Sequence, residues 1–271
     1  MSKRIITVAP TGAWPTKDNN PNVPMTPAEI AEDVYACYLA GASVAHLHMR
    51  DEEGKGTMDK NKFQETVALI KEKCDIVINL TTSGDLNATD ETRQEHLRLI
   101  KPEMASYDCG SMNWMHSGLF INHPKFLEEL AVTMNENGIK PEIEIFDPGM
   151  IYNAKYYVKK GFLQEPLHYQ FVLGAAGGIA ATVENLVFMK SLLPENCTWS
   201  AFGIGKGHVP ILLATIALGG HVRVGMEDNV MFSATQLADS NAQFVERAVN
   251  LIKEAGYEVA SPADARAILG V

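Results

Sequence analysis

The sequence contains the stretch Ala45-His46-Leu47-His48-Met49-Arg50-Asp51, which places two histidines two residues apart in an alternating run. On a β-strand this spacing points both imidazoles to the same face. The charged residues that follow mark the C-terminal end of the strand, where barrels and open α/β sheets keep their chemistry. We therefore predict a metal site here. The alternative is a pair of core histidines hydrogen-bonded to their neighbours.

Strand-like and helix-like runs alternate along the whole chain, and eight such units predict a single (β/α)8 barrel. The predicted strands are residues 5–10, 44–49, 76–82, 104–109, 142–147, 167–173, 199–204 and 221–226. The predicted helices are residues 26–40, 59–74, 92–100, 124–137, 150–160, 182–193, 209–218 and 234–255. A doubly wound open sheet is the alternative, but eight units without a domain break favour closure.

The size and composition of the chain suit one globular domain. It has 271 residues, of which 46% are hydrophobic and 21% charged, and a barrel of this class takes about 250 residues. We expect one domain over residues 1–271. A short C-terminal extension, from about residue 258 to 271, contains a helix start at Ser261-Pro262 and should cap the barrel or contact another subunit.

Charge and cysteine usage favour a small-molecule partner in the cytoplasm. The net charge is -10, and the Lys and Arg residues are scattered, which argues against a nucleic-acid surface. No signal peptide is evident, and the longest apolar window, residues 211–219, is far shorter than the ~20 residues that span a membrane. The four cysteines lie far apart without a Cys-x-x-Cys motif, so we expect no disulfide framework and a reducing compartment.

Polar residues crowd the inward positions near the predicted strand ends, although barrel interiors normally hold Val, Ile and Leu. They are His46, His48, Arg50, Asn79, Thr81, Ser83, Ser106, Asp108, Glu142, Glu144 and Arg223, with Glu227 and Asp228 in the loop after the last strand. Buried charges are unfavourable unless they pair or bind a metal. Two histidines and a carboxylate form a recurring catalytic zinc site, for which Glu227 is the best placed third ligand. Asp228 or Glu144 could replace it, and a solvated acidic turn is the structural alternative.

Two further features could bind anions. Arg223 could hold a carboxylate bidentately, either Glu144, Asp228 or a substrate acid, or could serve in a structural ion pair. The loop Gly203-Ile204-Gly205-Lys206-Gly207-His208 opens a helix, so Gly205, Lys206 and Gly207 are candidates to bind a phosphorylated cofactor. A tight turn is the alternative for these glycines. A similar glycine-rich loop, residues 174–178, is a weaker candidate.

The segments that carry these residues resemble the β-keto acid cleavage enzymes, a family that includes the 3-keto-5-aminohexanoate cleavage enzyme of lysine fermentation. They are residues 7–13, 22–27, 44–51, 79–84, 102–106, 142–149 and 224–229, and they follow one another over almost the whole chain. The resemblance implies a zinc-dependent (β/α)8 barrel, usually a homotetramer. It also implies a reaction in which a β-keto acid and acetyl-CoA give acetoacetate and a new acyl-CoA.

The resemblance also implies roles for individual residues. His46, His48 and Glu227 would bind zinc, which would stabilise the enolate of the keto acid. Asp228, supported by Arg223 and Glu144, would be the base that removes the α-proton. One of Thr82, Ser83 and Ser106 would hold the substrate carboxylate or keto oxygen.

Trp14 is a departure from the family pattern. The lysine-pathway enzyme has an acidic residue at the matching place, which would suit an amino substrate, so Trp14 weakens the case for such a substrate here. The indole could line an apolar pocket, stack on a quaternary ammonium, or simply pack at the end of the barrel.

Two other functional classes fit parts of the pattern. A class II aldolase or a metal-dependent hydrolase would use the same barrel, but an amidohydrolase would have further histidines at the ends of strands five and six. His168 lies at the opposite end of strand six. A barrel that only binds CoA, or whose zinc is structural, is the non-enzymatic alternative. A structural site would be closed by four ligands, whereas three are evident.

Overall fold

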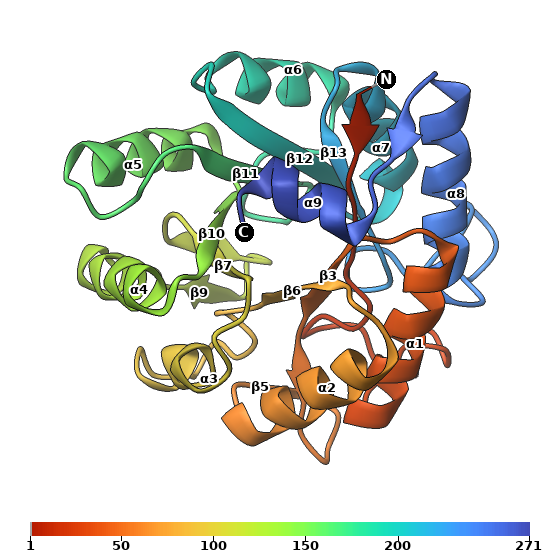
Figure 1. Cartoon of the computed structure of the whole chain (residues 1–271), viewed down its shortest axis with the longest axis horizontal. Coiled ribbons are helices and arrows are strands. Elements are labelled where there is room, and N and C mark those ends of the chain that lie inside the picture. The colour runs from red at the N-terminus through yellow and green to blue at the C-terminus, as the bar shows by residue number, and fades with distance from the viewer. Residues whose placement is uncertain (1) are drawn as a thin grey trace.

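The computed structural model describes residues 2–271, which form a closed barrel of eight parallel strands surrounded by helices (Figure 1). In order around the barrel the strands are β2 (Ile6–Val8), β3 (Val44–Leu47), β6 (Val77–Leu80), β7 (Met104–Asp108), β10 (Lys140–Ile145), β11 (Leu167–Leu173), β12 (Cys197–Gly203) and β13 (His221–Val224). Pairing of β13 with β2 closes the ring. The predicted (β/α)8 barrel is therefore confirmed, and the open-sheet alternative is excluded.

Within residues 2–271, eight helices surround the barrel, and all of them except α3 and α7 begin at a side-chain cap. They are α1 (Pro27–Ala40), α2 (Lys60–Lys73), α3 (Thr92–Ile100), α4 (Pro124–Asn137), α5 (Pro148–Lys159), α6 (Val183–Ser191), α7 (His208–Ala217) and α8 (Asn241–Glu254). Thr26 and Glu29 form a capping box at the start of α1. The prediction that the eighth barrel helix begins at Ala234 is wrong. This helix, α8, begins at Asn241, and the Ser240 side chain caps it by accepting a hydrogen bond from the backbone N–H of Gln243.

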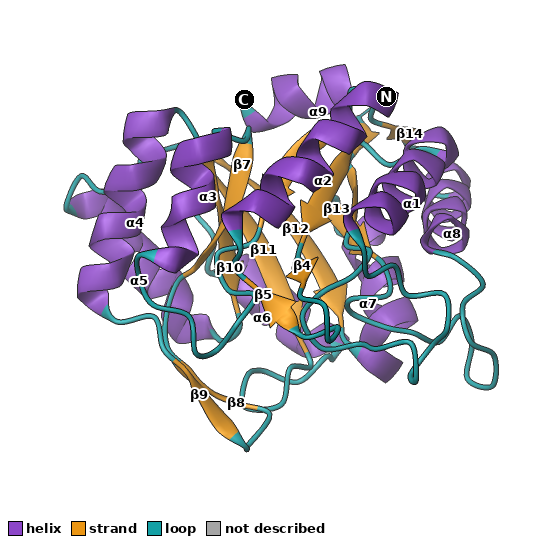
Figure 2. Ribbon diagram, turned by 90° about the horizontal axis from the view of Figure 1, so that it is seen from below, coloured by secondary structure: helices purple, strands orange, loops and turns teal. Residues whose placement is uncertain are grey.

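Two short hairpins follow barrel strands. One pairs β4 (Met49–Arg50) with β5 (Gly56–Thr57), and the other pairs β8 (Met112–Trp114) with β9 (Gly118–Phe120). Figure 2 shows β8 and β9 projecting from the barrel beyond the helices. The turn of this second hairpin contains Met115 and His116 at φ of 53° and 54°, without the Asn-Gly or Gly signal that usually marks such a turn. The sequence analysis therefore did not predict it.

The N-terminal end of the barrel is closed by apolar packing. Ile5, Val44, Val77 and Met104 form a buried cluster with Ala265 and Leu269 of α9 (Pro262–Leu269). The two-stranded sheet of β1 (Lys3–Arg4) and β14 (Glu258–Val259) joins the two ends of the chain beside it. The C-terminal segment thus packs across the barrel end opposite the strand C-termini.

The barrel interior is polar toward the C-terminal ends of the strands. Parallel register places His46 beside Asn79, and Ser106 beside Glu142, on neighbouring strands. These side chains are buried, together with His168, Ser200 and Arg223 from the far side of the barrel. None of the helices within residues 2–271 combines the length and apolar character needed to cross a lipid bilayer.

Candidate active site

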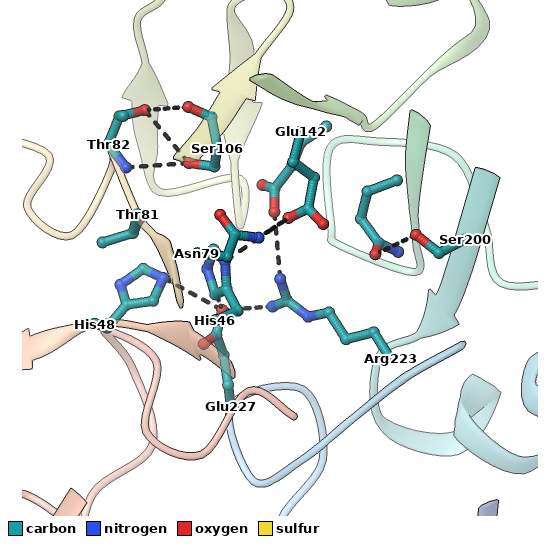
Figure 3. A network of polar contacts seen from close by, with 12 residues as sticks. His46, His48, Asn79, Thr81, Thr82, Ser106, Glu142, Ser200, Arg223 and Glu227 are labelled. Carbon is teal, nitrogen blue, oxygen red and sulfur yellow. Dashed lines mark hydrogen bonds and ion pairs between the residues drawn. The ribbon is translucent and has the colours of Figure 1, made fainter. Parts of the chain in front are cut away.

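Three potential metal ligands converge at the C-terminal end of the barrel. Oε1 of Glu227 lies 3.3 Å from Nε2 of His48 and 3.8 Å from Nε2 of His46. One ligand atom from each residue falls within 4.8 Å of the others, and Figure 3 shows the three side chains pointing toward one another. Tetrahedral zinc with bonds of about 2.0–2.2 Å separates its ligands by roughly 3.3–3.6 Å. The donor set and its spacing therefore fit a single divalent ion.

The local backbone explains why Glu227 reaches the histidines. Gly225, at φ 145°, ends β13 so close to β2 that a Cβ there would lie 2.1 Å from the carbonyl oxygen of Ala9. The backbone N–H of Glu227 then donates to that same carbonyl oxygen at 3.2 Å. Gly12, at φ 63°, leaves the space that the Glu227 side chain occupies, because a Cβ at Gly12 would lie 2.5 Å from its Cγ. The loop after β2 and the turn after β13 thus act together to place the Glu227 carboxylate beside the two histidines.

The protonation states of His46 and Glu227 also favour metal binding. Burial, together with the nearby Arg223 cation, lowers the pKa of His46 well below its ordinary value, so its imidazole is neutral. Burial opposes ionisation of Glu227, but the adjacent Arg223 guanidinium holds the pKa of that carboxyl well below its usual range. A neutral imidazole and an ionised carboxylate are the forms that bind a metal. The second oxygen of Glu227 is buried without a hydrogen-bond partner among residues 2–271.

Glu142 lies on the other side of His46. Its Oε1 accepts a hydrogen bond from Nδ2 of Asn79 at 2.7 Å and lies 3.8 Å from Nδ1 of His46. Its Oε2 lies 3.8 Å from Nε2 of His168. Burial raises the pKa of Glu142 to about 7. The sequence analysis placed Glu142 and Asn79 in the pocket without assigning them a role; only the lateral register of the strands shows that Glu142 faces the ring nitrogen that points away from Glu227.

Arg223 organises the acidic residues beside the three candidate metal ligands. Its Nε and Nη2 donate to the two carboxylate oxygens of Asp228, each at 2.9 Å. The guanidinium also donates to Glu144 at 3.3 Å and to Glu227 at 2.5 Å. Burial raises the pKa of Asp228 to about 6, although Arg223 acts in the opposite direction. The bidentate pair anticipated for Arg223 is thus with Asp228, whose pKa lies near neutrality.

The three hydroxyl candidates are placed differently. Ser83 lines the cavity in front of the metal ligands. Thr82 and Ser106 are fully buried and bonded to each other: the backbone N–H of Thr82 donates to Oγ of Ser106, and the Thr82 hydroxyl donates to the Ser106 carbonyl oxygen, both at 3.0 Å. Ser83 is therefore the candidate with direct access to a substrate.

The candidate phosphate loop forms a compact turn. Gly205, Lys206 and Gly207 form the 3₁₀ helix η1 (Gly205–Gly207) before α7, and Lys206 is exposed. The N–H of Gly205 donates to the carbonyl oxygen of Asp228, and that of Gly207 donates to the carbonyl oxygen of Ile204. These bonds use two of the N–H groups that a phosphate would need. Binding of a phosphorylated cofactor by this loop stays a prediction.

A cavity of about 170 Å³ opens in front of the three candidate metal ligands. Trp14 lies on its wall with 57% of its surface exposed and stacks on Trp114, at 6.1 Å between ring centroids. Trp114, Phe120 and Phe146 also line the cavity. The sequence analysis missed Trp114 and Phe120 because it did not predict the β8–β9 hairpin, and it did not assign Phe146, at the end of β10, to the site. The concentration of aromatic side chains around residues 112–120 was the available signal.

The chain matches one enzyme family over nearly its full length. Residues 3–271 match the family model described as beta-keto acid cleavage enzyme. The chain is 44% identical over 272 residues to the 3-keto-5-aminohexanoate cleavage enzyme of Fusobacterium nucleatum, covering 100% of this chain and 99% of that protein. It is 35% identical to the 3-dehydrocarnitine:acetyl-CoA trimethylamine transferase of Rhizobium meliloti, with 96% of this chain and 94% of that protein covered.

The fold is also similar to a solved structure. The apo structure of ObcA superimposes with a TM-score of 0.85 at 20% identity, over 92% of this chain and 66% of that one. This likeness shows a shared barrel fold. The match over residues 3–271 and the 44% identity above establish the family of this chain. The chain belongs to the β-keto acid cleavage enzyme family and is an enzyme.

Proposed function

We propose that this enzyme is a metal-dependent acyltransferase that converts a β-keto acid and acetyl-CoA into acetoacetate and a new acyl-CoA. The observation that carries the proposal is the convergence of His46, His48 and Glu227 beside the Arg223–Asp228 pair, at the inner end of a cavity. Relatives named as acetyl-CoA-dependent transferases of keto acids support the same reaction.

The metal would be held by His46, His48 and Glu227, and zinc is the ion that two imidazoles and a carboxylate suit best. When bound, it would supply a Lewis acid that makes the α-proton of the keto acid acidic at neutral pH. With three protein ligands, a position stays open for substrate, as in catalytic rather than structural zinc sites.

Asp228 would remove the proton from the carbon between the keto and carboxylate groups. Arg223 holds both oxygens of Asp228 and so fixes the direction of the carboxylate. The carbanion attacks the acetyl carbonyl and CoA thiolate leaves; the thiolate then adds to the keto carbon of the original substrate. Cleavage of the adjacent carbon–carbon bond releases the new acyl-CoA and the acetoacetate carbanion, which takes back the proton from Asp228.

The proposed reaction can be tested by measuring both of its products. Incubation with acetyl-CoA and a panel of β-keto acids should yield acetoacetate together with the thioester of the substrate acyl group. Products without a new CoA thioester would instead indicate an aldolase or a hydrolase. Binding of acetyl-CoA without any turnover would indicate a non-catalytic barrel.

Variants separate metal binding from proton transfer. We expect His46→Ala to lose bound metal and activity, and Asp228→Asn to keep the metal but lose turnover. His116→Asn provides a matched control, because His116 is exposed in the β8–β9 turn and Asn tolerates its positive φ. Full activity of metal-free protein, or normal turnover of Asp228→Asn, would refute these roles.

The family resemblance supports three further proposals. We propose that residues 1–271 work as one barrel domain with a C-terminal extension from about residue 258. We propose that the enzyme is a cytoplasmic homotetramer. Light scattering coupled to size-exclusion chromatography would test the oligomeric state, and a monomer at micromolar concentration would contradict it.

A further inference from the structure

The cavity in front of the metal ligands has two chemically different ends. Its ionisable lining residues are His48, Glu144, Arg223, Glu227 and Asp228, which gather at one end. Among the described residues, the remaining lining is apolar except for Ser83 and the backbone. The reacting part of a keto acid must lie at the charged end, so its side chain extends toward the apolar end.

The apolar end is a preformed aromatic surface. Trp114 packs edge-on against Phe120 and Phe146, with ring centroids 5.9 and 6.0 Å apart, and stacks on Trp14. These rings come from the β2–α1 loop, the β8–β9 hairpin and the end of β10, so distant segments meet around one space. Edge-to-face packing of this kind fixes the rings before a ligand arrives.

The described lining of the cavity contains no free counter-charge for a charged substrate side chain. The carboxylates at the metal end are already engaged: Asp228, Glu144 and Glu227 each accept a hydrogen bond from Arg223. Among residues 2–271, the aromatic end of the cavity contributes no Lys, Arg, Asp or Glu. A primary ammonium there would lose its water without gaining an acceptor, and attraction to ring faces offsets only part of that loss. A second carboxylate would find no donor cation.

We propose that the β-keto acid used by this enzyme carries an uncharged, apolar side chain that occupies the aromatic end of the cavity. This inference rests on the proposed function and adds the class of substrate. Burial of each additional methylene group should raise kcat/KM by about fourfold until the cavity is full.

Isosteric substrate pairs test the proposal directly. 5-Methyl-3-oxohexanoate and 5-amino-3-oxohexanoate differ only in a methyl group replacing an ammonium. 5,5-Dimethyl-3-oxohexanoate and dehydrocarnitine differ only in a quaternary carbon replacing the quaternary nitrogen. In the first pair, kcat/KM for the apolar member should be higher by at least about tenfold, because the ammonium N–H groups would lose their water without an acceptor. In the second pair the apolar member should also have the higher kcat/KM, because the part of residues 2–271 that forms the aromatic end offers the cation no carboxylate. An equal or higher value for the ammonium member of either pair would overturn the proposal.

A substitution of Trp14 can introduce a negative charge at the aromatic end of the cavity. Trp14→Glu should lower kcat/KM for 5-methyl-3-oxohexanoate and raise it for the amino analogue, whereas Trp14→Phe should preserve the wild-type order. Because Trp14 is largely exposed, neither change should prevent folding. If Trp14→Phe or Trp14→Glu changes the KM for acetyl-CoA but not for the keto acid, the aromatic end holds CoA and the proposal is wrong.

The two proposals fail in different ways. If no keto acid in the panel gives a new thioester, the proposed reaction itself is wrong. If thioesters form but the charged substrates are preferred, only the inference about the side chain is wrong.

Discussion

Replacement of Arg223 by methionine should strongly destabilise the protein. The Arg223 side chain is only 3% exposed and contacts three carboxylates, those of Glu144, Glu227 and Asp228. At an effective dielectric constant of about 20, each pair of opposite charges at about 4 Å is worth roughly 4 kcal/mol before desolvation is subtracted. Removing one partner of a buried ion pair typically costs about 3–5 kcal/mol, so we expect a loss in this range.

The assay is equilibrium unfolding in urea after treatment with a chelator, so that bound metal does not mask the loss. The guanidinium carbon of Arg223 lies 4.2 Å from the centroid of the Phe202 ring, and methionine would place an apolar side chain beside that ring. The variant should lose most stability at pH 8 and less at pH 5. Without Arg223 the pKa of Asp228, already raised to about 6, should rise further, and the pKa of Glu227 should rise above its unfolded value. Acidification then relieves the penalty by protonating both carboxylates.

A matched control uses an arginine near the surface. Arg266 also contacts two carboxylates, Asp75 and Glu103, but Asp75 is 84% exposed, so Arg266→Met should cost no more than about 1 kcal/mol. If Arg223→Met costs less than about 1 kcal/mol as well, Arg223 does not hold the acidic cluster together and the electrostatic account of this site is wrong.

Three further predictions follow from contacts around the site and the core. Glu142→Gln should weaken zinc binding by about 10- to 100-fold in a chelator competition, because Glu142 faces Nδ1 of His46; the surface change Glu254→Gln should leave it unchanged. Gly12→Ala should also weaken zinc binding, because the new Cβ would displace Glu227; unchanged affinity would contradict that contact. His208 is neutral in the core, where burial lowers its pKa from 6.5 to about 4. The unfolded state therefore binds the extra proton as pH falls through 6.5, and His208→Leu should gain about 2 kcal/mol relative to wild type between pH 7 and 5 in urea titrations. A pH-independent difference would refute this.

The barrel was predictable because local signals agree with the fold. Each strand is a short buried run, and the caps at Thr26, His123 and Ser261 each precede a proline at the start of a helix. The start of α8 was not predictable in the same way, since residues 234–240 include apolar residues that the structure uses in a loop. An isolated antiparallel bridge joins Met231 to Leu237 in this loop.

The convergence of His46 and His48 was predictable from strand parity, because they lie two residues apart. The pair of Arg223 with Asp228 depends instead on the tight turn that follows β13. The contacts of Glu142 were not predictable, because they depend on how far neighbouring strands are staggered. At the aromatic end Trp14 was anticipated, but Trp114 was missed, because it reaches the cavity through a hairpin whose turn uses positive φ at residues other than glycine.

The pairing of β1 with β14 brings both chain ends to the barrel face that α9 covers, and Figure 2 shows these ends on the side opposite the β8–β9 hairpin. An affinity tag or a fused partner at either end would therefore point away from the cavity. Attachment to a sensor surface through such a tag should leave ligand access intact. Immobilised protein can then be used to compare metal and substrate analogues without releasing it from the support.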